Sequence, residues 1–228
     1  IRHRVYDKSE AVICATKGIE RQIRAQGIES VTTIYNGYPK ELLAYEINKF
    51  DRFTLVFHGT LGVFQDIDLL IALSCELKGD DVDILVIGHG RKSDLVADAQ
   101  CKHENLKFMG SLSHQNTLEI VSRCHLGLSF RLNDPLSKIS FPVKNWEYLG
   151  LSIPSLLTPI GTEAGSFLER NQCGLQFESD NLKGITEMVR ELKKQESSYL
   201  NLVGNCAKIR KVHTREEYSK QFSALFFK

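Results

Sequence analysis

Residues 53–90 read FTLVFHGTLGVFQDIDLLIALSCELKGDDVDILVIGHG and contain one complete strand–helix–strand unit. The apolar runs Phe53–His58 and Val82–Ile87 each end at a glycine. Continuous apolar runs of this length indicate strands that are buried on both faces of a parallel sheet. The segment between them, Asp66–Leu77, carries apolar residues at helical spacing. We therefore predict a βαβ unit with a right-handed connection.

The same alternation continues in both directions along the chain. Helix-length segments separate further short apolar or β-branched runs, and the six other predicted strands are Ala11–Ala15, Val31–Tyr35, Asn105–Met109, His125–Phe130, Ile153–Thr158 and Cys173–Phe177. Strands that alternate with helices predict an α/β fold with a Rossmann-like, doubly wound parallel sheet. We expect six of these strands, between about residues 50 and 180, to form that sheet.

The composition is that of a globular protein. The chain has 228 residues, of which 42% are apolar and 25% charged, so disorder, collagen and coiled coil are excluded. The 29 basic and 28 acidic residues nearly cancel, which argues against nucleic acid as a partner. No apolar run reaches the length of a membrane span and no signal-peptide pattern opens the sequence, so we expect a soluble, cytoplasmic protein.

Cysteine and histidine spacing argues against a metal site. The six cysteines form no CxxC pair and the seven histidines are scattered, so we interpret the cysteines as buried reduced thiols. The segment GHGRKS, residues 88–93, lacks the last glycine of GxGxxG and follows the second strand of its domain. It therefore gives little support to a nicotinamide or flavin cofactor. We predict neither a cofactor nor a metal.

The chain is organised around a break at Asn36–Pro39. Residues 1–35 hold two predicted strands and one helix, Thr16–Gln26, which is too little to bury both faces of a sheet. After about residue 177 only helices are predicted, and the last is Thr214–Phe227. In this helix Tyr218, Phe222 and Leu225 form an apolar face that needs a partner. We expect the two ends of the chain to meet.

Glycine follows three of the predicted strands, at Gly59, Gly88 and Gly110. In open α/β sheets, ligands bind at the carboxyl ends of the strands. Glycine there lets a phosphate approach the backbone, and the next helix N-terminus favours negative charge. The alternative interpretation is that glycine only allows tight turns.

The segment Ile139–Pro154 reads ISFPVKNWEYLGLSIP. It resembles the carboxy-terminal, donor-binding domain of the retaining GT-B glycosyltransferases of family 4, which carries two glutamates separated by seven residues. Six residues fall on family-like positions, namely Ser140, Phe141, Val143, Glu147, Leu149 and Pro154. Further segments match in order, namely Ala11–Gly37, His58–Leu70, Asp83–Gly90, Asn105–Gly110 and Thr162–Gly174. The resemblance thus covers nearly the whole chain.

The resemblance implies a role for Glu147, because the second glutamate of the family binds the ribose hydroxyls of a sugar nucleotide. A carboxylate suits a vicinal diol, since it accepts two hydrogen bonds. The resemblance further implies that Lys144 faces the diphosphate. The alternative is that these two residues form a surface i, i+3 pair. Together with the glycine turns and the loop after residue 130, the resemblance leads to nine predicted donor-binding residues, namely Glu147, Lys144, Gly59, Thr60, Gly110, Arg131, Lys138, Ser140 and Phe141.

The departures from the family pattern lie where charged side chains are expected. The first glutamate of the family falls on Ile139, its phosphate-binding arginine on Thr60, and its lysine on Gln65. Arg131 and Lys138, in the polar loop RLNDPLSKIS, are candidates to restore the positive charge, and Asp134 is a candidate for a sugar contact. A plain solvated loop is the alternative. The catalytic residue stays unassigned.

The resemblance divides the chain into four parts. Residues 1–37 match a remnant of the amino-terminal GT-B domain, 38–52 a linker, 53–212 the carboxy-terminal nucleotide-sugar-binding domain, and 213–228 the crossing helix. The fold then corresponds to the C-terminal half of a GT-B enzyme, and the missing amino-terminal domain of the same enzyme becomes a partner. We expect the chain to be a fragment of a longer enzyme and to be inactive alone.

The implied function is transfer of a sugar from a nucleoside-diphosphate sugar to a polysaccharide or glycolipid acceptor. In the full-length enzyme, the resemblance implies peripheral association with the inner membrane face. The alternative is a non-catalytic GT-B-like module in a glycosyltransferase complex, which the residues Ile139, Thr60 and Gln65 favour. A nucleotide-sugar epimerase is a third, weaker interpretation. The nucleotide base, the sugar, the acceptor and the oligomeric state are open.

Overall fold

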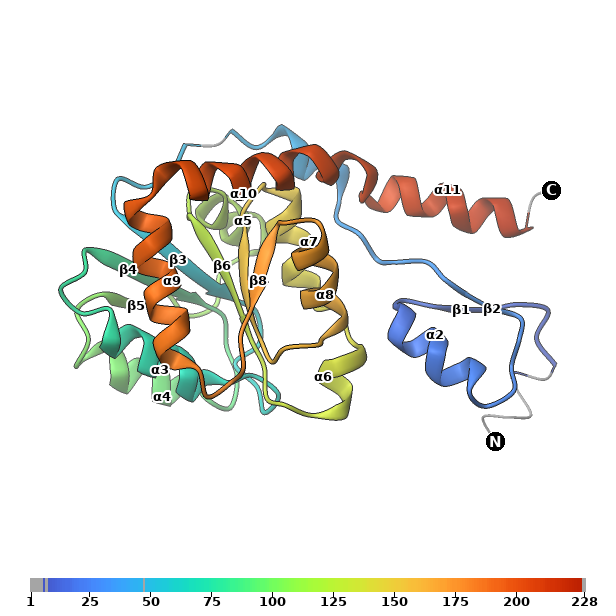
Figure 1. The fold of residues 1–228 in the computed structure, drawn as a ribbon, viewed down its shortest axis with the longest axis horizontal. Helices are drawn as coiled ribbons and strands as arrows, with labels where there is room; N and C mark the ends of the chain where they lie inside the picture. Colours follow the sequence, from blue (N-terminus) through green and yellow to red (C-terminus); the bar gives the residue numbers. More distant parts are fainter. Residues whose placement is uncertain (1–5, 7, 47, 227–228) are drawn as a thin grey trace.

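The computed structural model describes residues 6, 8–46 and 48–226, and its centre is a parallel sheet of six strands (Figure 1). The strands are β3 (Phe53–His58), β4 (Val82–Ile87), β5 (Leu106–Phe108), β6 (Leu126–Phe130), β7 (Ser155–Thr158) and β8 (Gly174–Gln176). Their spatial order is β5-β4-β3-β6-β7-β8, and all neighbours are parallel. The predicted α/β fold class is therefore confirmed.

The strand order reverses between β3 and β6. The chain builds outward from β3 to β5 and then returns to the other side of β3 with β6. In open α/β sheets such a switch point opens a crevice at the carboxyl ends of the two strands. The carboxyl ends here are His58 of β3 and Phe130 of β6. The fold alone therefore marks this edge of the sheet as the place for a ligand.

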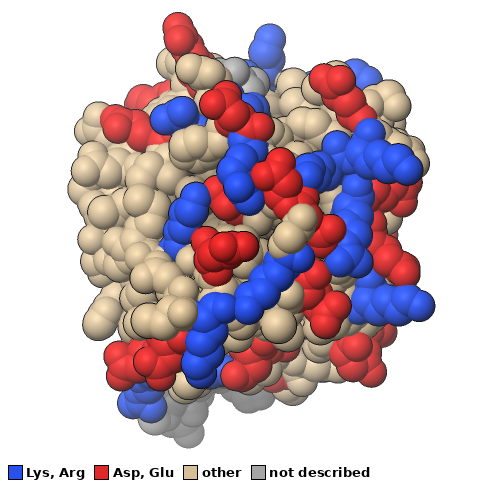
Figure 2. All heavy atoms as spheres, turned by 90° about the vertical axis from the view of Figure 1, so that its left-hand side faces the viewer, with Lys and Arg blue, Asp and Glu red and all other residues tan. Residues whose placement is uncertain are grey.

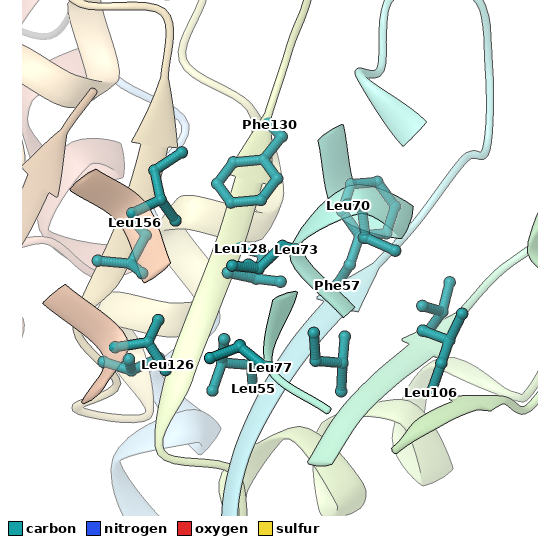
Figure 3. Close-up of a cluster of buried hydrophobic side chains, with 14 of the residues drawn as sticks. Leu55, Phe57, Leu70, Leu73, Leu77, Leu106, Leu126, Leu128, Phe130 and Leu156 are labelled. Carbon is teal, nitrogen blue, oxygen red and sulfur yellow. The ribbon is translucent and has the colours of Figure 1, made fainter. Parts of the chain in front are cut away.

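Helices cover both faces of the sheet. One face carries α3 (Ile67–Glu76), α4 (Ser93–Gln100) and α9 (Leu182–Lys194), and the other α5 (His114–Ser122), α7 (Val143–Gly150) and α8 (Glu163–Arg170). Alternate residues of a strand point to opposite faces, so Leu55 and Phe57 of β3 join the first hydrophobic cluster and Val56 the second. Figure 3 shows part of the first cluster, where Leu70 and Leu73 of α3 lie over the sheet.

Residues 8–36, which we call the amino-terminal unit, form a small body of their own. Two parallel strands, β1 (Val12–Cys14) and β2 (Val31–Thr33), flank the helix α2 (Lys17–Arg24), and a separate apolar cluster lies between them. The unit touches the main sheet domain through α6 (Pro135–Ile139). Here Thr16 Oγ1 donates a hydrogen bond of 2.6 Å to the Ile139 carbonyl oxygen. The predicted strands and helix of this unit are confirmed, although each is shorter than expected.

The chain returns to the amino-terminal unit at its end. After α10 (Glu196–Ile209) and the short 3₁₀ helix Arg210–Val212, α11 (Arg215–Phe226) leads away from the sheet towards that unit (Figure 1). The Arg215 N–H donates to the Tyr38 carbonyl oxygen over 2.8 Å, and the rings of Tyr35 and Tyr218 lie 5.9 Å apart. The two ends therefore meet, as predicted. The last two residues of the predicted crossing helix, 227 and 228, lie outside the described residues.

Three sequence expectations need correction. The apolar face of the last helix finds its partner only in part, because Tyr218 is buried against Tyr35 and Trp146, whereas Phe222 and Leu225 are 48% and 39% exposed. The predicted linker 38–52 contains a 3₁₀ helix, Lys40–Ala44, whose Leu42 is buried in the second cluster. Finally, only four cysteines are buried, because Cys75 and Cys101 are exposed.

Charges of both signs are interspersed on the surface. Figure 2 views the molecule from the left-hand side of Figure 1, and blue and red side chains are mixed over the centre and right of that view, whereas its left part is mostly uncharged. Ion pairs account for part of the pattern, for example Arg190 with Asp80 at 2.8 Å and Arg52 with Asp81 at 3.1 Å. Exposed pairs of this kind contribute little to stability, about 0–1 kcal/mol each.

Candidate functional site

The three glycine turns predicted from the sequence lie side by side at the carboxyl edge of the sheet. The Gly59 N–H donates to the Ile87 carbonyl over 2.9 Å, and the Gly88 N–H donates to the Gly110 carbonyl over 2.8 Å. All three glycines have positive φ, of 112°, 147° and 63° in chain order. A Cβ atom on Gly88 would lie 1.8 Å from the Gly59 carbonyl oxygen, so the two turns can pack this closely only without a side chain.

Lys144, in the first turn of α7, points its ammonium group at the Gly59 turn. A Cβ atom on Gly59 would lie 3.8 Å from Lys144 Cε, and Lys144 Nζ lies 3.4 Å from the centre of the Phe57 ring. Nζ is buried and has no hydrogen-bond partner among the described residues. Burial, and secondarily the charge of Arg131, lowers the pKa of Lys144 to about 7. An unpartnered cation in a protein interior is costly, and an anionic ligand would satisfy it.

The N-terminus of α7 adds to this preference for an anion. Asp66 and Ser113 cap α3 and α5 with their side chains, but α7 begins after Pro142 without a side-chain cap. The free N–H groups of a helix N-terminus and the helix dipole favour negative charge. Lys144 and this helix end therefore present positive potential at the same place.

Glu147 lies one helical turn beyond Lys144, and its side chain is 6% exposed. Its Oε1 atom accepts a hydrogen bond of 2.7 Å from His114 Nε2, and its Oε2 atom lies 3.5 Å from His58 Nε2. Burial, with the nearby charges of Lys144 and His114, lowers the pKa of His58 to about 3. His58 is therefore neutral at ordinary pH, and its contact with Glu147 is not an ion pair.

The polar loop after β6 is more ordered than the sequence indicates. Asp134 caps a five-residue helix, α6, by accepting hydrogen bonds from the N–H groups of Leu136 and Ser137. Its second oxygen accepts from the Ser137 hydroxyl at 2.5 Å, and these bonds hold its pKa below the ordinary value. The proposed sugar contact of Asp134 is thus replaced by a structural role as a helix cap.

The two basic residues of this loop differ in their surroundings. Arg131 is half-buried, and its Nε donates to the Ser137 hydroxyl over 3.0 Å. Burial lowers its pKa, and it lies close enough to Lys144 to lower the pKa of that residue too. Lys138 is exposed and its Nζ lies 3.4 Å from the Ile160 carbonyl oxygen. The structure therefore brings Arg131 to the site and leaves Lys138 at its periphery.

The remaining predicted residues divide into two groups. Thr60 and Gly110 lie in the glycine turns, and Ser140 ends α6, where its hydroxyl donates to the Ser137 carbonyl. Phe141 is different, because its ring stacks on Trp146 at 4.0 Å and is only 6% exposed. We therefore remove the Phe141 side chain from the proposed site and assign it to the core.

Ile139, which occupies the position of the first family glutamate, is covered by the amino-terminal unit. A Cβ atom on Gly18 would lie 2.8 Å from Ile139, and Thr16 bonds its carbonyl group. The side chain is partly buried in this contact. The Ile139 side chain therefore packs against the amino-terminal unit and makes no polar contact.

Sequence reasoning missed the roles of two histidines. His58 ends β3 directly before Gly59, so its place at the edge of the sheet was readable from the sequence. His114 carried no comparable signal, because its partner Glu147 is 33 residues away. Neither histidine was predicted as a site residue. In the described part of the chain, no group of three His, Cys, Asp or Glu side chains is placed to hold a metal ion.

The chain as a whole is similar to known proteins in sequence and in fold. The chain is 25% identical over 217 residues to an uncharacterised glycosyltransferase of Methanocaldococcus jannaschii, which covers 94% of this chain and 56% of that protein. It is structurally similar to S. aureus TarM, solved with UDP among its ligands (TM-score 0.74, 18% identity, 98% of this chain and 45% of TarM). It is also similar to Anabaena HepE in complex with UDP (TM-score 0.78, 13% identity, 95% of this chain and 63% of HepE). No protein-family model matches the chain.

These likenesses confirm the predicted resemblance to GT-B glycosyltransferases, and the fold is that of their Rossmann-like domains. The chain spans about half the length of the curated relative, 56%. Among the helices that the structure describes, none has the length and apolarity needed to cross a membrane.

Proposed function

We propose that this chain forms the donor-binding side of a glycosyltransferase that uses a nucleoside-diphosphate sugar. The observation that carries the proposal is the pair formed by Lys144 and Glu147 on one face of α7. One is a buried ammonium without a partner at a glycine turn, and the other is a buried carboxylate one turn away. A nucleoside diphosphate offers the complementary groups, a diphosphate and a ribose diol.

In this proposal the diphosphate lies over the Gly59 turn. Lys144, the uncapped N-terminus of α7 and Arg131 supply the positive charge there. The backbone of a glycine turn admits a phosphate oxygen because no side chain blocks it. Glu147 accepts hydrogen bonds from the ribose hydroxyls. Support comes from the relative named a glycosyltransferase and from neighbours solved with UDP.

The chemistry follows from the charge that develops during transfer. When the bond between the sugar and the diphosphate breaks, the leaving diphosphate gains negative charge. Lys144, protonated when an anion is bound, stabilises that charge in a site that excludes water. In this proposal, an amino-terminal Rossmann-like domain forms the opposite wall of the cleft and supplies the acceptor contacts. Without it, we expect the chain to bind donor and not to turn over. A polysaccharide or glycolipid acceptor and peripheral membrane association are further parts of the proposal.

A non-catalytic GT-B-like module is the second candidate. The contact of Ile139 with Gly18 and Thr16 favours it, because this apolar contact replaces a residue that would bind the donor sugar. Such a module would bind a nucleoside diphosphate and gain no further affinity from the attached sugar.

A panel of nucleoside diphosphates and their sugar conjugates tests both candidates by thermal shift. Ligand binding to the folded state raises the melting temperature by mass action. We expect one base to stabilise the wild-type chain and the control Glu191→Gln, an exposed residue of α9, to the same extent, and Glu147→Gln clearly less. A larger shift with the sugar conjugate favours the enzyme, and equal shifts favour the module. If no nucleoside diphosphate stabilises the wild-type chain at millimolar concentration, the proposal is rejected.

A further inference from the structure

The carboxylate of Glu147 is held by a residue that reaches in from the surface. His114 is the first residue of α5, after the cap Ser113, and its side chain is 64% exposed. Its Nε2 atom nevertheless lies 2.7 Å from Glu147 Oε1, on a side chain that is only 6% exposed. The contact joins α5 to α7. An exposed histidine therefore makes a short hydrogen bond to a buried carboxylate at the mouth of the site.

The other groups around Glu147 do not hold it in the same way. His58 of β3 is neutral, and its Nε2 lies 3.5 Å from Oε2, longer than a good hydrogen bond. Lys144 of α7 acts on Glu147 by charge, but its Nζ lies on the Phe57 ring without a hydrogen bond. Arg131, after β6, faces Lys144 and bonds Ser137. Among the described residues, His114 is the side chain whose hydrogen bond fixes the direction of this carboxylate.

We propose that His114 is a positioning residue for the nucleotide-binding carboxylate. Its Nε2–H fixes the rotamer of Glu147, so that Oε2 and the free lone pair of Oε1 point at the ribose diol. The inference rests on the proposed function of Glu147 as the ribose-binding residue. A carboxylate offers about four acceptor positions, so one bond to His114 leaves enough for a diol. Because His114 is exposed, it affects ligand binding without contributing to the core.

The tautomer of His114 gives the inference a signature. The hydrogen bond from Nε2 to Glu147 Oε1 requires a proton on Nε2, because a carboxylate oxygen only accepts. A neutral ring that makes this bond therefore keeps one tautomer. Removal of the carboxylate should release the ring from that tautomer.

Calorimetric titration of the full chain with UDP, GDP, ADP, CDP, dTDP and inorganic pyrophosphate tests the inference. We expect His114→Ala to weaken the preferred nucleotide about tenfold, the loss of one charge-assisted hydrogen bond. His114→Gln keeps an N–H donor at similar reach and should stay within about threefold of wild type. Pyrophosphate affinity should be unchanged in both variants, because pyrophosphate carries no ribose. Gln115→Ala, an exposed neighbour on α5, is the control for local disturbance of the helix.

Two results would overturn the inference and leave the proposed function standing. One is a His114→Ala protein that binds the nucleotide as tightly as wild type while Glu147→Gln does not. The other is an NMR result on the ligand-free wild-type protein, in which the ring nitrogen signals of neutral His114 show exchange between tautomers. The inference requires a fixed Nε2–H tautomer that is lost in Glu147→Gln. If the tautomer is fixed and no nucleotide binds the wild-type chain, the proposed function fails and the assignment of His114 to nucleotide binding fails with it.

Discussion

The ammonium group of Lys144 lies 3.4 Å from the centre of the Phe57 ring and 4.0 Å from the position that a Cβ atom on Gly59 would occupy. The ring face offers partial compensation for a buried cation, but it is no substitute for a counter-ion. The fold thus holds a positive charge at the end of β3, where the strand order reverses. This unpaired charge lowers the stability of the free protein and favours the binding of an anion.

The pH dependence of stability should reveal this arrangement. The folded state releases the Lys144 proton at about pH 7, whereas the unfolded chain keeps it to its ordinary value of 10.5. Between these values the unfolded state binds more protons, so the free energy of unfolding rises with pH. Each pH unit adds at most about 1.4 kcal/mol. Lys49, whose pKa burial lowers to about 8, contributes a slope of the same sign.

Urea unfolding of Lys144→Met across about pH 7 to 10 measures the contribution of this one residue. We expect a less positive slope of stability against pH than in wild type. The difference between the two slopes is the contribution of Lys144, because Lys49 and the buried cysteines and tyrosines titrate in both proteins. The exposed Lys183→Met, on α9, is the control and should keep the wild-type slope. Equal slopes in all three proteins would show that Lys144 is not a buried cation.

The glycine turns make a prediction that depends on geometry alone. Gly79 and Gly88 both have positive φ, of 79° and 147°. A Cβ on Gly79 would meet nothing within 4 Å, whereas one on Gly88 would collide with the Gly59 carbonyl at 1.8 Å. Gly79→Ala should cost about 1–2 kcal/mol of stability, from backbone strain only. Gly88→Ala should cost several times more or prevent folding. Chemical denaturation compares them, and similar losses would contradict the packing of the two turns.

One carboxylate of the sheet domain bonds the amino-terminal unit at two places, in addition to the contact of that unit with α6. Glu163, at the start of α8, accepts hydrogen bonds from the Tyr35 hydroxyl at 2.7 Å and from the Lys17 N–H at 3.1 Å. Burial and this carboxylate raise the pKa of Tyr35, so its hydroxyl stays a donor. Glu163→Ala leaves both donors without an acceptor, at a cost of about 1–3 kcal/mol.

Amide hydrogen exchange measures this effect where it occurs. In Glu163→Ala we expect faster exchange in β1, α2 and β2, with the six-stranded sheet unchanged. Glu169→Ala, at the exposed end of the same helix, is the matched control. If exchange in the amino-terminal unit is equally slow in both variants, Glu163 does not hold that unit.

The sheet was predictable from the sequence because its strands are continuous apolar runs. Phe53–His58 and Val82–Ile87 were predicted with their correct bounds, since every residue of both strands is buried. The edge strands were predicted too long, as in Asn105–Met109, where the structure has a strand only over Leu106–Phe108 although both flanking residues still bond β4. The short helix α6 was missed, although the pattern Asp134–Pro135 is a helix start signal.

The candidate site was only partly predictable. Glu147 and Lys144 followed from a resemblance in local sequence, and the glycine turns from their positions after strands. The hydrogen bond between His114 and Glu147 depends on how α5 and α7 pack against each other on one face of the sheet, which no local pattern encodes. The failure at Phe141 has the same origin, because ring stacking with Trp146 decides whether an aromatic residue faces a ligand or the core.

The most direct test of the central claim is one calorimetric comparison on two variants. Pyrophosphate and the preferred nucleoside diphosphate are titrated into wild type, Lys144→Met and Glu147→Gln, near pH 7. We expect Lys144→Met to weaken both ligands by about tenfold or more, because both carry the diphosphate. We expect Glu147→Gln to weaken the nucleotide by a similar factor and to leave pyrophosphate unchanged, because only the nucleotide carries a ribose. Equal losses for both ligands in Glu147→Gln, or unchanged pyrophosphate affinity in Lys144→Met, would contradict the account.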